Sequence, residues 1–322
     1  MDILKPTDLK AILHSKRANI YYLQYCRVMQ KDGRVLYLTE GQNENLYYNI
    51  PIANTTCILL GTGTSITQAA MRLLASAGVL VGFCGGGSTP LFTGCEIEWL
   101  TPQSEYRPTE YVQGWLSWWF DDDKRLIIAK QLQLARLCFL QKVWQKDKDF
   151  KSYGFDIKDE FVAKLLDQYQ KEIVLQDSNH DLLALEGRMT KELYKIAAQS
   201  TRNAGFHRDV DGIDKANRFL NHGNYLAYGL GATTTWVLGI PHGFAVMHGK
   251  TRRGALVFDI ADLIKDAIVL PLAFICAKDN ASEQEFRQEV LNYFTDYHAL
   301  DFMFDTVKEM ALTKDFSKRE GQ

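Results

Sequence analysis

The pattern that most constrains this chain is a helical spacing of apolar residues over its last two thirds. From Thr101 onward, apolar residues recur at intervals of three and four, which places them on one face of an α-helix. The pattern covers six segments: 109–147, 158–176, 181–203, 215–236, 256–270 and 281–313. Pro102 and Pro108 flank the linker that precedes them. This part of the chain is expected to be all-helical.

The residues before the linker are patterned as strands. Val35–Thr39 follows an Asp32–Gly33 turn that itself follows an apolar run, which predicts a β-hairpin. The expected elements are strands over 18–29, 35–39, 58–61 and 79–84, and one helix over 67–77 that Gly78 ends. We therefore predict an α+β protein. A small β-rich N-terminal domain over 1–101 precedes an all-helical domain of about twice its length over 102–322.

Composition places the chain among globular proteins that do not cross a membrane. It has 322 residues, 46% hydrophobic and 24% charged, which is enough for two separate cores. The N-terminus lacks the apolar segment of a signal peptide. The most apolar stretch, 255–277, is interrupted by three aspartates, a lysine and Pro271. Six cysteines without close spacing indicate reduced thiols, so we expect a cytoplasmic protein.

Charge is unevenly distributed although the net charge is only −2. Residues 186–254 hold ten Lys and Arg against five acids, whereas 255–322 hold seven against thirteen. A basic block beside an acidic one suits a polyanionic substrate such as DNA. The alternative is a chance clustering of charges on solvated helix faces.

Three acids interrupt the apolar run 255–270. Asp259, Asp262 and Asp266 would share one helix face, and a half-buried carboxylate needs a cation or a proton. His248 precedes Asp259 by eleven residues. Imidazole and carboxylates near a Lys-Thr-Arg-Arg run indicate a divalent metal acting on a phosphodiester. The spacing matches no zinc signature, so a solvated Asp259 and an ordinary core histidine remain alternatives.

A glycine-containing turn offers a second candidate site. Gly61 and Gly63 follow a strand and precede a helix, as in phosphate-binding turns. The turn lacks the Gly-Lys-Ser/Thr of a P-loop and the third glycine of a dinucleotide fingerprint. A tight turn without a bound nucleotide is therefore the favoured interpretation, and no cofactor-binding residues are predicted here.

Longer motifs resemble a known family. The runs Gly239–His248 and Leu256–Asp262 resemble the signature of the CRISPR-associated adaptation integrase, a metal-dependent DNA endonuclease that inserts new spacers into CRISPR arrays. Asn217–Tyr225 resembles the family's Asn-rich helix, and Leu185–Arg188 the segment that holds its glutamate ligand. The resemblance covers essentially the whole chain. Its details, including Asn49–Thr56, are most similar to the type I-F branch.

The resemblance implies a site and a reaction. The family's metal ligands correspond to Glu186, His248 and Asp262, with Asp259 as an adjacent acid, whereas Asp266 is expected to be exposed. The metal would be Mg²⁺ or Mn²⁺. The implied reaction is transesterification, in which the 3′-hydroxyl of a captured DNA fragment attacks the leader–repeat boundary. Water as the nucleophile would instead cleave DNA, branched DNA included.

The resemblance also implies partners. They are double-stranded and branched DNA, a second copy of the chain, and a small ferredoxin-like adaptation protein fused to a helicase-nuclease. The β-rich domain would form the homodimer. Basic residues near the predicted site are candidates for phosphate contacts, namely Arg188, Lys250, Arg252 and Arg253. Two other functions stay open: a non-catalytic DNA-binding scaffold and a metal-dependent phosphohydrolase of small substrates.

Overall fold

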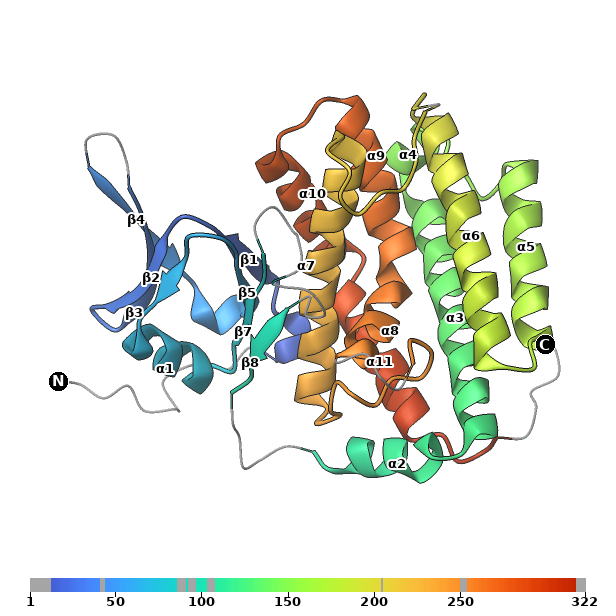
Figure 1. Ribbon diagram of the computed structural model, residues 1–322, viewed down its shortest axis with the longest axis horizontal. Coiled ribbons are helices and arrows are strands. Elements are labelled where there is room, and N and C mark those ends of the chain that lie inside the picture. Colours follow the sequence, from blue (N-terminus) through green and yellow to red (C-terminus); the bar gives the residue numbers. More distant parts are fainter. Residues whose placement is uncertain are drawn as a thin grey trace. The chain divides into compact units, whose positions relative to one another are not determined.

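The structure is a computed structural model that describes residues 13–40, 44–85, 91, 97–102, 108–203, 205–249 and 254–316. The chain divides into two compact units, Met1–Arg107 and Pro108–Gln322. The first is rich in strands and the second is helical, as Figure 1 shows. The predicted α+β class, with a β-rich N-terminal part before a larger helical part, is therefore confirmed.

Two four-stranded sheets and one α-helix make up the described part of the first unit. One sheet has the order β1-β5-β7-β8, with β1, β5 and β7 parallel and β8 antiparallel; the other has the order β4-β3-β2-β6. Helix α1 (Gln68–Ser76) contributes Ala70 and Leu74 to a core shared with residues of both sheets. The strands are β1 (Asn19–Leu23), β2 (Arg27–Lys31), β3 (Arg34–Glu40), β4 (Asn45–Ile50), β5 (Thr55–Leu60), β6 (Ser65–Ile66), β7 (Leu80–Phe83) and β8 (Glu98–Leu100).

The segment predicted as one strand over 18–29 forms two strands in different sheets. Tyr25, between β1 and β2, has a φ of 49°, and its N–H donates to the carbonyl of Thr62 at 2.9 Å. This left-handed residue interrupts extended pairing, so the chain leaves one sheet and enters the other. The predicted hairpin joins β2 to β3, and both Asp32 and Gly33 have positive φ, as its two-residue turn requires.

The second unit contains ten α-helices among its described residues. Six of them begin after an Asp or Ser whose side chain accepts a backbone N–H, which satisfies donors that the first helical turn leaves free. The helices are α2 (Glu110–Trp119), α3 (Asp122–Lys146), α4 (Lys148–Ser152), α5 (Glu160–Leu175), α6 (Asn179–Ser200), α7 (Lys215–Val237), α8 (Ala255–Ile264), α9 (Leu270–Lys278), α10 (Glu283–Asp296) and α11 (Ala299–Ala311).

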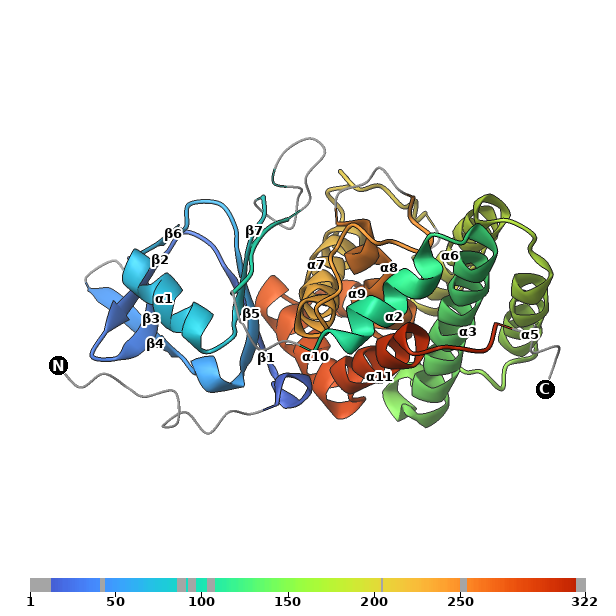
Figure 2. The same ribbon diagram turned by 90° about the horizontal axis from the view of Figure 1, so that it is seen from below.

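Two predicted helical segments are each divided by a local break. The segment 109–147 becomes α2 and α3 because Asp121 caps a new helix after Phe120. The segment 281–313 becomes α10 and α11, separated at His298, whose φ is 53°. Figure 2 shows α2 beside α11, and Trp118 of α2 donates its indole N–H to the carbonyl of Met310 at 3.2 Å. Apolar periodicity continues across such breaks, so the pattern does not locate them.

Helix α8 lies at the centre of the second unit and carries the predicted acids. All ten of its residues are buried, and it packs against both α3 and α7. A π-helical turn, η5 (Lys265–Val269), joins it to α9, where a single helix was predicted. Pro271 has no N–H to donate to the carbonyl of Ala267 four residues earlier, and the indole of Trp144 donates to that carbonyl at 3.1 Å. Helices with such turns frequently carry functional groups.

Within the described ranges, no helix is both long and apolar enough to cross a membrane.

Candidate metal centre

The backbone before α8 is folded around one carboxylate. Oδ2 of Asp259 accepts the N–H groups of Val246 and Met247 at 2.6 and 3.1 Å. Its other oxygen, Oδ1, accepts the backbone N–H of His248 at 3.2 Å and lies 2.6 Å from Nδ1 of the same residue. Asp259 is therefore buried, and its carboxylate holds the backbone of residues 246–248 in place. The alternative of a solvated acid at a helix end is wrong.

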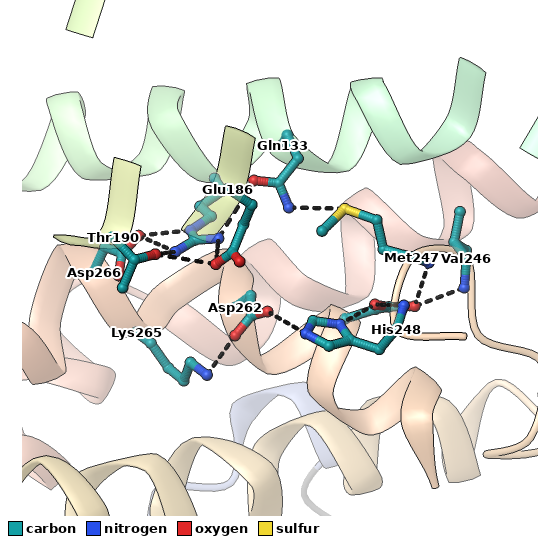
Figure 3. A network of polar contacts seen from close by, with 11 residues as sticks. Gln133, Glu186, Thr190, Val246, Met247, His248, Asp262, Lys265 and Asp266 are labelled. Carbon is teal, nitrogen blue, oxygen red and sulfur yellow. Dashed lines mark hydrogen bonds and ion pairs between the residues drawn. The ribbon is translucent and has the colours of Figure 1, made fainter. Parts of the chain in front are cut away.

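The bond to Asp259 fixes the orientation of the imidazole of His248. An ionised carboxylate can only accept, so Nδ1 carries the proton, and a neutral ring then has its lone pair on Nε2. Nε2 points toward Asp262 and lies 3.8 Å from Oδ2 of that residue (Figure 3). Burial disfavours the charged ring, but the hydrogen bond to Asp259 and the negative charge of Asp262 outweigh it and raise the pKa of His248. The imidazole thus faces a second carboxylate.

Asp262 is buried on α8 and has a cationic partner in the next turn. Its Oδ1 pairs with Nζ of Lys265, whose ammonium also lies 5.3 Å from the ring centre of Tyr228. Burial would raise the pKa of this carboxyl, but the charges of Lys265, Arg136 and His248 outweigh it and keep the pKa of Asp262 below its usual value. Asp262 is therefore an ionised carboxylate in a nearly closed environment.

Glu186 approaches from α6 and is held by an arginine of α3. Its Oε1 accepts from a terminal nitrogen of Arg136 at 2.8 Å and from the hydroxyl of Thr190 at 3.1 Å. Its Oε2 makes no hydrogen bond to any residue that the structure describes. Glu186 and Asp262 line the same small pocket, together with Arg136 and Lys265.

The three predicted ligands are thus brought to one region, but not into one coordination group. His248 and Asp262 face each other (Figure 3), whereas Oε1 of Glu186 pairs with Arg136. As they stand, no three His, Cys, Asp or Glu side chains in the described ranges are close enough together to hold a metal ion.

Comparisons with known proteins decide the family. The family model described as "CRISPR associated protein Cas1" matches residues 20–301. The CRISPR-associated endonuclease Cas1 of Pseudomonas aeruginosa (strain UCBPP-PA14) is 56% identical over 317 residues, which cover 97% of this chain and 98% of the relative. The chain belongs to the Cas1 family.

Solved Cas1 structures share the fold. A Cas1 protein from Thermotoga maritima superposes with a TM-score of 0.72 at 16% identity, covering 94% of this chain and 99% of its own. The protein in a TtCas1–DNA complex has a TM-score of 0.64 at 21% identity, covering 94% and 95%. At these identities the likeness establishes the fold of this Cas1 family member.

One prediction about the site is wrong. Asp266 was expected to be exposed, but it is buried, and its Oδ2 accepts from Nε of Arg136 at 2.6 Å. The expectation followed from the family resemblance, which gives Asp266 no counterpart among the metal ligands, although its helical spacing from Asp259 and Asp262 places all three acids on one face. The π-helical turn and the arginine of α3 instead place Asp266 inside this Cas1 unit with a permanent cation.

Two groups of site residues were not predicted from the sequence. Arg136 is one, because a single arginine in the periodic pattern of α3 looks like any surface charge. Trp115 and Trp119 of α2 are the others: their indoles donate to the carbonyls of Phe244 and Ala245 at 3.1 and 2.8 Å. These bonds hold the segment before His248. Tryptophans four residues apart were a signal for a shared face, but not for what that face contacts.

The predicted phosphate-contacting residues are only partly described. Arg188 lies on α6 with an exposed side chain and pairs with Glu172 of α5 at 3.4 Å. An exposed pair of this kind is weak, so Arg188 can still reach a ligand. Lys250, Arg252 and Arg253 lie outside the described residues of this Cas1 chain.

Proposed function

We propose that this chain is a divalent-metal-dependent DNA endonuclease and integrase of CRISPR adaptation. The observation that carries the proposal is the pair formed by His248 and Asp262, 3.8 Å apart, with Asp259 fixing the ring. Two ligands at ~2.1 Å from one ion are ~3.0 Å apart when adjacent and ~4.2 Å apart when opposite, so the pair has a spacing that one ion can bridge. The 56% identity to a curated Cas1 endonuclease supports the activity.

The local charge also suits a divalent cation. Arg136 pairs with Glu186 and Asp266, and Lys265 pairs with Asp262. Asp259, a fourth carboxylate, pairs with His248. An imidazole must be neutral to bind a metal, and with His248 in that form the carboxylates outnumber the two cations. Buried negative charge is costly without a counter-ion, which a divalent cation would provide. Carboxylate oxygens and one imidazole are donors that Mg²⁺ and Mn²⁺ accept. His248, Asp262 and Oε2 of Glu186 would hold the ion.

The chemistry follows from what these residues would hold together. A bound divalent ion would supply charge that polarises the scissile phosphate and lowers the pKa of the attacking hydroxyl. In integration, the 3′-oxygen of the captured fragment would form a bond to the phosphorus at the leader–repeat boundary. The bond from that phosphorus to the 3′-oxygen of the leader would break, and the leader would leave with a 3′-hydroxyl that takes up the proton lost by the attacking one, so the number of phosphodiesters is unchanged. In cleavage, including that of branched DNA, water takes the place of the 3′-hydroxyl and a phosphodiester is lost. The role of His248 is to present Nε2 at a fixed position.

Partners follow from the same proposal. The substrate is double-stranded or branched DNA, and the TtCas1–DNA complex supports DNA as a ligand for a protein of this fold. We infer a homodimer that joins a small ferredoxin-like adaptation protein fused to a helicase-nuclease, as in the type I-F branch.

One observation favours a different function. Because Glu186 is paired with Arg136 and no three ligands are grouped in the described residues, a DNA-binding scaffold without a metal is the second candidate. It predicts DNA binding with no affinity for Mn²⁺.

The deciding experiment replaces Asp262, Glu186 or His248 with Ala, one at a time. Mn²⁺ affinity by isothermal titration calorimetry, DNA cleavage and spacer integration are measured for each. We expect integration and cleavage to fall to background while circular dichroism shows a folded protein. Asp305→Ala is the matched control, since Asp305 is an exposed acid of α11. Full activity of Asp262→Ala, or no Mn²⁺ binding by the wild-type protein, contradicts the proposal.

A further inference from the structure

Arg136 connects two elements that carry proposed ligands. It lies on α3 with 2% of its side chain exposed, and its guanidinium contacts α6 on one side and η5 on the other. Toward α6 it donates to Glu186 at 2.8 Å and to Thr190 at 3.2 Å. Toward η5 it donates through Nε to Asp266 at 2.6 Å. A planar guanidinium with several donors in fixed directions sets the separation of the groups it binds.

The guanidinium is a permanent cation at this position. Burial works against its charge, but the carboxylates of Asp266, Glu186 and Asp262 outweigh burial and raise the pKa of Arg136 further. Removing one partner of such a buried pair would leave an uncompensated charge. Arg136 therefore stays charged, and its hydrogen bonds to both carboxylates are charge-assisted.

The two oxygens of the Glu186 carboxylate differ in their hydrogen bonding. Oε1 is bound by Arg136 and Thr190, which also bond to each other. Oε2 is left without a hydrogen bond from the described residues. A carboxylate held by one oxygen has a defined direction for the other, as groups behind metal ligands generally provide.

We propose that Arg136 is a positioning residue that holds Glu186 by one oxygen and ties α6 to η5, and that it thereby determines the affinity of the site for a divalent ion. This role rests on the metal centre proposed above. Asp262 precedes η5 by one turn of the same continuous helix, so the tie through Asp266 also fixes Glu186 relative to Asp262.

A role in charge balance alone makes a different prediction. A cation near a metal site opposes metal binding by Coulomb repulsion, so a charge-only Arg136 would matter through its charge and not through its geometry. A substitution that keeps the positive charge but removes the planar set of guanidinium N–H donors therefore separates a positioning role from a role in charge balance.

The experiment is Arg136→Lys in the full chain, with Mn²⁺ affinity measured by isothermal titration calorimetry and melting recorded with and without Mn²⁺. Lys keeps the charge but offers a point cation that cannot bridge both sides. We expect Mn²⁺ binding to weaken by about 10- to 100-fold, with a smaller Mn²⁺-dependent rise in melting temperature. Arg17→Lys is the matched control: Arg17 is a buried arginine of the first unit that bonds the carbonyl of Thr55.

Thr190→Val provides a second variant that alters no charge and removes the other hydrogen bond to Oε1. It should fold even if Arg136→Lys does not, and it should also weaken Mn²⁺ binding. Unchanged Mn²⁺ affinity in Thr190→Val and in a folded Arg136→Lys would overturn the positioning role while the metal centre stands. Absence of Mn²⁺ binding by the wild-type protein would remove the metal centre and this role with it.

Discussion

Asp259 accepts the Nδ1 proton of His248 at 2.6 Å, and this bond decides which ring nitrogen faces Asp262. The same carboxylate accepts three backbone N–H groups of residues 246–248. It therefore fixes both the backbone position and the ring orientation of His248. Asp259 acts on the proposed metal through His248, since both its oxygens are already bonded.

Asp259→Asn should weaken metal binding and destabilise the fold. Both oxygens of Asp259 accept hydrogen bonds, whereas an amide has one acceptor. Either the imidazole or the backbone of Val246 and Met247 must then face an NH₂ group. We expect Mn²⁺ affinity to fall by about 10- to 100-fold and the free energy of unfolding to fall by about 1–3 kcal/mol. Calorimetric titration and urea denaturation measure the two effects. Wild-type Mn²⁺ affinity in this variant would show that the bond does not orient the ligand.

Trp119→Phe should loosen the segment before His248. Phe keeps an aromatic ring but loses the N–H that donates to the carbonyl of Ala245 at 2.8 Å. The free energy of unfolding should fall by about 1 kcal/mol, and Mn²⁺ affinity should fall as well. Trp118→Phe is the matched control, because its indole bonds Met310 of α11 and not this segment. It should lower stability and leave Mn²⁺ binding unchanged; equal Mn²⁺ affinities in the two variants would argue against the anchoring role.

The division into strands and helices followed from local pattern, whereas the partners of the buried charges did not. Asp259 and Asp262 were identified because acids in an apolar run need counter-charges, and they are buried beside His248. Glu186 came from family resemblance, since nothing in its local spacing marks it. Asp266 was misjudged because the family resemblance gives it no role and because its cationic partner, Arg136, lies 130 positions away in the chain.

The contacts of Arg136 could not be predicted from local pattern either. Along the chain, Arg136 is 50 positions from Glu186 and 130 positions from Asp266, so its contacts depend on how α3, α6 and η5 pack. Local sequence patterns indicate which face of a helix or strand is buried and where the element ends. They do not indicate which residue of another element packs against that face, because this depends on the tertiary structure.

The first unit is expected to mediate homodimer formation. Family resemblance implies a dimer, and β4, an edge strand, has exposed Leu46, Tyr47 and Tyr48, which a monomer would leave in water. Light scattering at micromolar concentration should give twice the mass of the 322-residue chain. Tyr47→Lys combined with Leu46→Glu places charges on this strand and should shift the mass toward that of the monomer if β4 takes part. A monomeric wild-type protein at these concentrations would refute the dimer.

Neutralising Arg252 and Arg253 together should weaken binding to DNA of every sequence. Both follow His248 closely in the chain, so they are expected within reach of phosphates beside the metal, where contacts position DNA without reading its bases. Loss of two phosphate contacts should make the slope of log affinity against log salt concentration shallower by about 1.8 for duplex DNA.

The alternative is that both arginines form salt bridges to the acidic C-terminal third, which predicts a lower melting temperature with unchanged DNA affinity. Measuring melting and binding on the same Gln double variant separates the two. The control is the double variant Lys171→Gln with Lys308→Gln, which removes the same amount of charge from α5 and α11. An equal change of slope in this control would mean that the net charge of the protein, and not contacts from Arg252 and Arg253, causes the effect.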